Sequence, residues 1–130
     1  MARWIVNVRS YCADPAHEKE FNDWYNNIHI PDILTCPGYI SATRYDMETP
    51  ATIMIPRVYM TTYEIETDDI MKTMQIRDER RRREAAIGGY SGGGQYVRGL
   101  GAFCYRLMYP TFTKDNTPPA PHAYKANPPK

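Results

Sequence analysis

The stretch that decides the fold is residues 21–32, which read Phe-Asn-Asp-Trp-Tyr-Asn-Asn-Ile-His-Ile-Pro-Asp. Its large apolar residues recur at the i, i+3, i+4 and i+7 spacing of one helix face: Phe21, Trp24, Tyr25 and Ile28. His29 follows Tyr25 by four residues and is predicted to lie beside it. Pro31 disfavours helical geometry at the residue before it, which predicts a helix end near His29. There the negative end of the helix dipole would favour a protonated imidazole.

Length and composition limit the classes of protein that fit this sequence. A chain of 130 residues predicts one domain with a sizeable core. Its 16 Lys and Arg balance 15 Asp and Glu, so nucleic acid is not favoured as a partner. Eleven tyrosines fit a pocket or an interface, and they fit an ordinary β-rich core equally well.

The cysteines and histidines indicate an intracellular protein without a metal site. Cys12, Cys36 and Cys104 are odd in number and widely spaced, which is typical of reduced thiols. The three histidines do not form a ligand triad, so no metal and no other cofactor is expected. No long apolar run predicts a signal peptide or a membrane span, and the expected location is the cytoplasm.

The pattern along the chain predicts a β-α-β-β-α-β order, the ferredoxin-like plait. The predicted strands are residues 4–11, 39–46, 57–66 and 102–112, and the predicted helices are residues 15–29 and a second one opened by residues 67–69. The fold class is therefore α+β, with a four-stranded antiparallel sheet and both helices on one face. Strands one to three carry substantial side chains on both faces, so a second copy of the chain is expected to cover the other face.

Four segments lie outside this simple scheme. The apolar residues 53–55 are expected to lie over a pocket or a partner subunit, and the charged run 77–84 is expected to be a solvated helix face. The glycine-rich residues 88–99 form either a lid or a plain connection. Residues 1–112 are predicted to form the domain, and the Pro-rich residues 113–130 an extended arm that is disordered or crosses a neighbouring subunit.

Three sequence pieces carry a resemblance to a known family. They are Phe21-x-x-Trp24-Tyr25-x-x-x-His29-Ile30-Pro31, Pro37-Gly38-Tyr39-x-Ser41-Ala42-x-Arg44-Tyr45 and Tyr59-x-x-x-Tyr63-Glu64. Together they resemble the EthD-like branch of the dimeric α+β barrel superfamily. The resemblance implies a homodimer and a ligand cavity between sheet and helices, bordered by His29. It also implies cofactor-free chemistry of the kinds found among relatives, which include cyclases, decarboxylases, dehydratases and metal-free monooxygenases. Some relatives have a histidine in strand one, where this chain has Asn7 and Arg9.

The candidate site follows from these residues. His29 is either a general acid or base, or a structural histidine that closes the helix. Tyr25 is expected to donate to an oxyanion. Asn7 and Arg44 are expected to orient a polar group, unless Arg44 forms a salt bridge with Asp46, Asp32 or Glu64. The remaining candidates for the cavity wall are Trp24, Tyr59, Tyr63 and Tyr105.

The sequence thus favours a cofactor-independent lyase or cyclase acting on a small hydrophobic aromatic or carbonyl compound. Two alternatives share the same cavity. One is a cofactor-free, metal-free monooxygenase, and the other is a dimer that binds a small molecule without catalysis.

Overall fold

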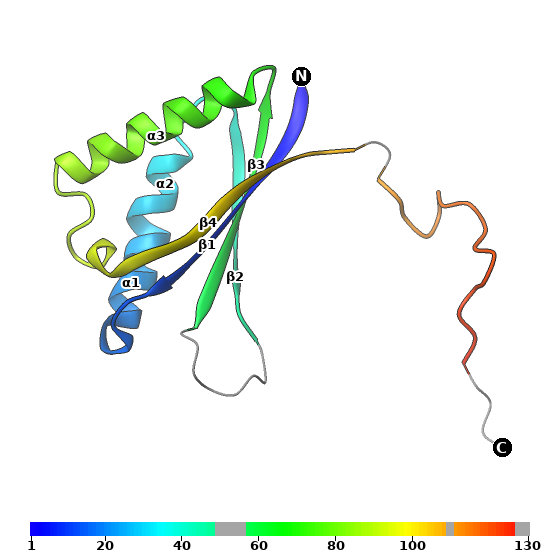
Figure 1. The fold of residues 1–130 in the computed structure, drawn as a ribbon, viewed down its shortest axis with the longest axis horizontal. Helices are drawn as coiled ribbons and strands as arrows, with labels where there is room; N and C mark the ends of the chain where they lie inside the picture. The colour runs from blue at the N-terminus through cyan, green and yellow to red at the C-terminus, as the bar shows by residue number, and fades with distance from the viewer. Residues whose placement is uncertain (49–56, 109–110, 127–130) are drawn as a thin grey trace.

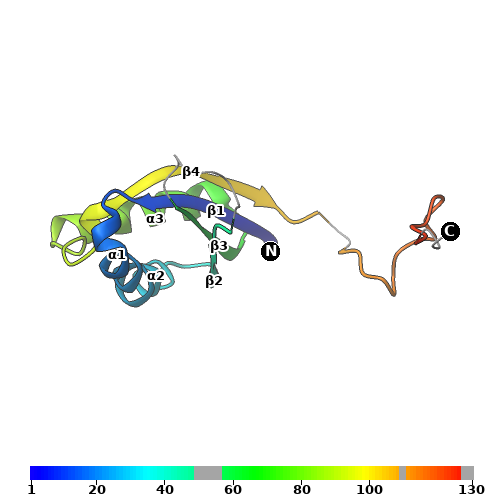
Figure 2. The same ribbon diagram turned by 90° about the horizontal axis from the view of Figure 1, so that it is seen from below.

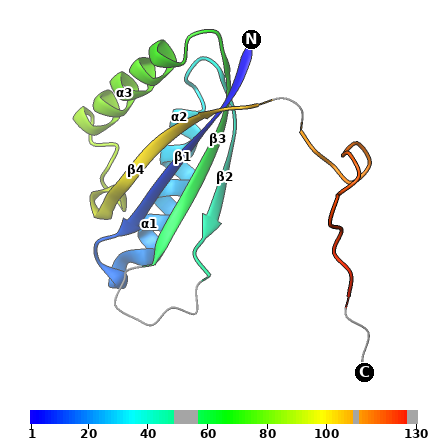
Figure 3. The same cartoon turned by 45° about the vertical axis from the view of Figure 1, so that its right-hand side comes forward.

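The chain folds around one antiparallel sheet, in a computed structural model that describes residues 1–48, 57–108 and 111–126. The strands are β1 (Ala2–Cys12), β2 (Tyr39–Asp46), β3 (Val58–Thr67) and β4 (Val97–Arg106), and they lie in the order β2-β3-β1-β4 (Figure 3). The predicted α+β ferredoxin-like fold, with its β-α-β-β-α-β order, is confirmed. The predicted cover formed by residues 53–55 lies outside the described residues.

The first helical stretch is longer than the sequence predicts. Asp14 caps its start by accepting a hydrogen bond from the Ala16 N–H at 3.0 Å, and Pro15 is its first residue. A 3-10 turn (Pro15–His17), α1 (Glu18–Trp24), a π-helical turn (Tyr25–His29) and α2 (Ile30–Ile33) then follow without a break (Figure 1). The predicted helix end at His29 is therefore wrong.

The π-helical turn explains how the helix passes Pro31. In a regular α-helix the proline ring would crowd the carbonyl of Asn27, and the missing N–H would leave a gap in the hydrogen bonds. Here the Ile30 N–H bonds to the Tyr25 carbonyl, five residues back, so the turn before the proline is wider than usual. His29 consequently lies inside the helical stretch and not at its end.

The two faces of the sheet follow the alternation of the strands. The face toward the helices buries Val6, Ser10, Tyr59, Tyr63 and Ile65. One departure comes from an irregularity beside Ile40, where the register with β3 shifts. Tyr39 therefore joins the helix-facing layer and packs on Tyr63, with ring centroids 5.6 Å apart.

β4 begins five residues earlier than predicted. The predicted glycine-rich segment extends to Gly99, but Gly99 and Gly101 both belong to the strand and pair with Ser10 and Arg9 across a register shift in β1. Gly101 has φ +129, a conformation that glycine adopts readily and other residues rarely do. A short 3-10 turn (Gly94–Tyr96) leads into the strand.

α3 (Ile70–Ala86) lies beside the α1–α2 stretch, on the same face of the sheet (Figures 1 and 2). Asp69 caps its first turn by accepting from the Lys72 N–H at 3.1 Å, which agrees with the predicted start. The prediction that residues 77–84 form a solvated face is wrong at its end, because Glu84 is only 5% exposed and contacts His29.

The opposite face of the sheet is open in the single chain. After β4, residues 111–126 are exposed, form no helix or strand and lead away from the sheet (Figure 3). Across the three described ranges, no helix combines the length and apolarity that a membrane span requires.

Candidate functional site

A cavity of about 330 Å³ lies between the sheet and the helices. Its floor comes from Val8 and Ser10 of β1 and from Val97 and Gly99 of β4. Its walls are Trp24, Tyr25, His29, Arg81 and Tyr90. The predicted position of the cavity, bordered by His29, is thus found in the structure, with a volume at the lower end of the range for small-molecule sites.

The π-helical turn builds an aromatic enclosure around His29. A π-helix places residues i and i+5 above one another, because each turn holds more residues than in an α-helix. Trp24 accordingly stacks on the His29 ring, with centroids 4.9 Å apart and planes 18° apart. Tyr25 and Tyr90 meet the imidazole edge-on, at 5.1 and 6.0 Å between centroids. The imidazole is therefore surrounded by rings on several sides.

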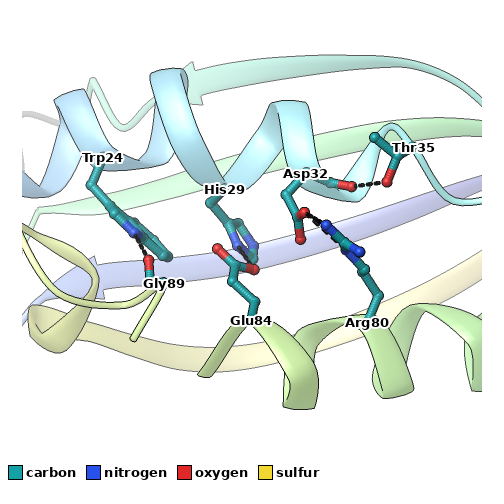
Figure 4. A network of polar contacts seen from close by, with 7 residues as sticks. All are labelled: Trp24, His29, Asp32, Thr35, Arg80, Glu84 and Gly89. Carbon is teal, nitrogen blue, oxygen red and sulfur yellow. Dashed lines mark hydrogen bonds and ion pairs between the residues drawn. The ribbon is translucent and has the colours of Figure 1, made fainter. Parts of the chain in front are cut away.

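The glycine-rich segment forms one wall of this enclosure. The Trp24 Nε1–H donates to the Gly89 carbonyl at 2.7 Å (Figure 4). Gly94 touches the indole so closely that a Cβ there would lie 2.5 Å from the ring. The missing side chain lets the backbone approach Trp24, and Tyr90 is thereby held against His29.

A line of polar side chains supports His29 from behind (Figure 4). The His29 Nδ1 atom lies 3.3 Å from Glu84 Oε2, and the two side chains are 12% and 5% exposed. Asp32 comes next, and the Arg80 Nε donates to its Oδ1 at 2.8 Å. The helical stretch that carries His29 and the last turns of α3 are thus joined by ionisable groups.

Burial gives these groups unusual protonation states. It lowers the pKa of His29 from 6.5 to about 4, because a charged imidazole would lose its water, and the nearby Asp32 only partly opposes this effect. Burial also raises the pKa of Glu84 from 4.5 to about 7, helped by the charge of Asp32 and by a hydrogen bond with its side chain. Between these values the imidazole is neutral and the carboxyl group holds the proton.

The orientation of His29 decides which nitrogen faces a ligand. Nδ1 faces Glu84 Oε2, and the tautomer of the ring decides which of the two groups donates. Nε2 makes no hydrogen bond within residues 1–48, 57–108 and 111–126. With the ring proton on Nδ1, Nε2 is a neutral base at the wall of the cavity.

Three further candidates form a layer behind Tyr25. The Arg44 guanidinium lies 4.3 Å above the Tyr25 ring and 5.0 Å from the Tyr59 ring, and its Nη1 donates to the Asn26 Oδ1 at 2.9 Å. Tyr63 is 3% exposed, and burial raises the pKa of its hydroxyl above the ordinary value. These side chains support Tyr25 from outside the cavity wall.

The alternative partners considered for Arg44 are engaged elsewhere. Asp46 pairs with Arg57, Asp32 with Arg80 and Glu64 with Arg3. Within the described part of the chain, Arg44 thus forms no salt bridge with any of the three. Its Nε and Nη2 atoms are buried and lack hydrogen-bond partners.

Asn7 and Tyr105 lie on the wrong face for the His29 cavity. Val6 and Val8 face the helices, so strand alternation turns Asn7 to the open face. Tyr105 pairs with Ile5 on that same face and is 57% exposed. The expectation that these two residues line the cavity beside His29 is corrected by this geometry.

Sequence reasoning missed Glu84, Ser10 and Tyr90 as parts of the site. Glu84 ends a run of four arginines, and that pattern resembles a solvated face. Its signal is visible only with the fold, because α3 must lie against the His29 helix. No cluster of three or more metal-ligating side chains occurs in the described ranges.

Comparison with known proteins gives the fold but no closer relationship. No protein-family model and no curated protein matches the sequence. Among solved structures, HapK from Hahella chejuensis superposes with TM-score 0.61 and 11% identity over 85% of this chain and 97% of its own. A dimeric ferredoxin-like protein from an uncultured marine organism superposes with TM-score 0.55 and 10% identity over 88% of this chain and 94% of its own. An EthD family protein from Bacillus halodurans superposes with TM-score 0.50 and 13% identity over 83% of this chain and 100% of its own. The chain has the fold of these three proteins.

Proposed function

We propose that this protein is a cofactor-independent lyase or cyclase that moves a proton on a small hydrophobic aromatic or carbonyl compound. The observation that carries the proposal is the position of His29, which lines the cavity among aromatic rings and contacts the buried Glu84. Burial also lowers the pKa of His29 and so favours a neutral ring. A histidine that only closed a helix would need neither a cavity nor a buried carboxyl group. Likeness of fold does not assign this activity.

His29 acts first as a base in this mechanism. Its Nε2 takes a proton from the carbon beside a carbonyl group, and the electron pair of that C–H bond moves toward the carbonyl oxygen. The imidazolium that forms donates its Nδ1–H to Glu84 Oε2, and this hydrogen bond steadies the positive charge. The proton then passes from Nε2 to the departing or newly formed oxygen, for example a hydroxide that leaves as water. No oxidant or cofactor takes part in this sequence.

Tyr25 is the candidate that steadies the negative charge on the carbonyl oxygen. It lines the cavity beside His29, and Arg44 lies over its ring. A phenol donates a hydrogen bond to an oxyanion more strongly than to a neutral carbonyl, so the interaction favours the transition state. Trp24 stacks on the His29 ring and forms part of the cavity wall. Tyr59, Tyr63 and Arg44 hold Tyr25 in place.

We also propose that two copies pair through the open face of the sheet. That face carries Ile5, Tyr45, Phe103 and Tyr105, each between 39% and 57% exposed. Large exposed apolar groups on one surface mark interaction sites, and the marine neighbour is described as dimeric. In this arrangement Asn7 and Tyr105 belong to the subunit interface.

The experiment is a screen of aromatic hydroxy-carbonyl and keto compounds in D₂O, followed by NMR. His29 removes a proton from the reacting carbon, so the product lacks that hydrogen, and reversible proton removal places solvent deuterium at the same carbon of the recovered substrate. His29→Gln is expected to abolish turnover and deuterium incorporation, while His122→Gln in the exposed C-terminal segment leaves both unchanged. Unchanged turnover in His29→Gln would refute the assignment. Oxygen consumption would instead indicate a monooxygenase, and capture of one ligand per subunit without product would indicate a binding protein.

A further inference from the structure

Arg81 is the charged side chain on the wall of the cavity that the proposed reaction does not use. It lies on the last turns of α3 and is exposed. Two other arginines of α3 form ion pairs: Arg80 pairs with Asp32, and Arg77 pairs with Asp78. Arg81 makes no ion pair or side-chain hydrogen bond within the described ranges.

Cations outnumber anions around the cavity. Arg81, Arg77 and Arg44 act on His29 through their charge in the direction that disfavours its protonation, and Asp32 acts in the opposite direction. No aspartate or glutamate lines the cavity, and Glu84 lies behind His29. A guanidinium beside a cavity without a carboxylate is a binding group for an anion.

Helix geometry places Arg81 on the same side of α3 as Glu84. The two residues are three positions apart, so their Cβ atoms lie roughly 5 Å from each other. Glu84 contacts His29 and Arg81 lines the cavity, so this side of α3 faces the surroundings of the imidazole.

We propose that Arg81 is a specificity-determining residue and that the substrate is an anion. The substrate class is a small aromatic or carbonyl compound that carries a carboxylate and fits the cavity that Arg81 and His29 share. This inference rests on the proposed function for the reacting atom, but the anion site itself rests on Arg81 and the cavity alone. The aromatic ring lies in the cavity beside His29 and Tyr90, and the carboxylate lies at Arg81.

The test compares matched carboxylates and amides as probes. Benzoate and 2-naphthoate are titrated against benzamide and 2-naphthamide, and dissociation constants come from ligand-observed NMR on the full chain. The wild-type protein is expected to bind each carboxylate about tenfold more tightly than its amide, with a preference that shrinks as salt is added. Arg81→Gln is expected to weaken the carboxylates about tenfold and leave the amides unchanged. Arg82→Gln, an exposed neighbour outside the cavity wall, should preserve the preference.

Several outcomes would overturn the proposal. They are equal binding of carboxylate and amide by the wild-type protein, equal weakening of both by Arg81→Gln, and binding of neither at low millimolar concentration. His29→Gln separates this failure from a failure of the proposed reaction. A His29→Gln protein that keeps the carboxylate preference supports the anion site even where turnover gives no support to the acid–base role.

Discussion

Replacement of Glu84 by Gln should make the free energy of unfolding depend on pH. In the native protein the proton uptake of His29 and Glu84 cancels this dependence. Between pH 4.5 and 6.5 the folded protein holds one proton on Glu84 and none on His29, given pKa values of about 7 and about 4. The unfolded chain also holds one proton in this window, but on His29, whose ordinary pKa is 6.5. Because both states bind the same number of protons here, the pair contributes no slope to the free energy of unfolding.

Glu84→Gln removes one half of this balance. His29 stays buried, so it is neutral in the folded protein but protonated in the unfolded chain. The free energy of unfolding therefore falls as pH drops from 6.5 toward 4. Each pH unit changes the free energy of unfolding by about 1.4 kcal/mol at most, so the loss across the window reaches about 3 kcal/mol. His29→Gln should do the opposite. Glu84 then keeps a proton that the unfolded chain loses, and stability falls by a similar amount as pH rises from 4.5 to 7.

The assay is urea denaturation at a series of pH values between 4.5 and 7. Glu79→Gln is the matched control for the carboxyl group, since Glu79 is exposed on the same helix. His122→Gln is the control for the histidine. If Glu84→Gln and Glu79→Gln give parallel pH profiles, then burial does not set the protonation of this pair, and the reasoning about His29 is wrong.

Three other changes have defined outcomes. Gly94→Ala drives a Cβ into the Trp24 ring and should lower the free energy of unfolding by about 1–3 kcal/mol in urea, whereas Gly99→Ala has open space and should change it little. Tyr25→Phe should reduce kcat about a hundredfold by removing an oxyanion donor, with Tyr124→Phe as a neutral control. Of the three thiols, exposed Cys104 should react fastest with a disulfide reagent, and Cys104→Ser should remove the fast phase while buried Cys12 and Cys36 stay slow.

The sequence carries the fold because its signals are local and agree with one another. Alternation marks β1 and β3, Asp14 and Asp69 mark helix starts, and the spacing from Phe21 to Ile28 marks the helix face. The prediction of the helix end was wrong because a general rule about proline has an exception that depends on the backbone geometry. A proline normally ends a helix, but the widened turn at residues 25–29 lets it continue.

Part of the site could be predicted from local sequence patterns in the same way. His29, Tyr25 and Trp24 lie on one helix, so their spacing alone brings them together. Arg81 reaches the cavity and Glu84 reaches His29 only because α3 runs beside that helix, and a run of arginines contains no sign of which residue turns inward. Asn7 was assigned to the wrong face of the sheet because β1 carries large side chains on both faces.

The most direct test of the central claim is the protonation state of His29, measured by nitrogen-15 NMR of histidine-labelled protein at pH 5.5. The missing signal in His29→Gln assigns its resonances. The account predicts a neutral ring with the proton on Nδ1 and a free Nε2. A cationic His29 ring at this pH, or a neutral ring protonated on Nε2, would contradict the claim that a neutral base faces the cavity.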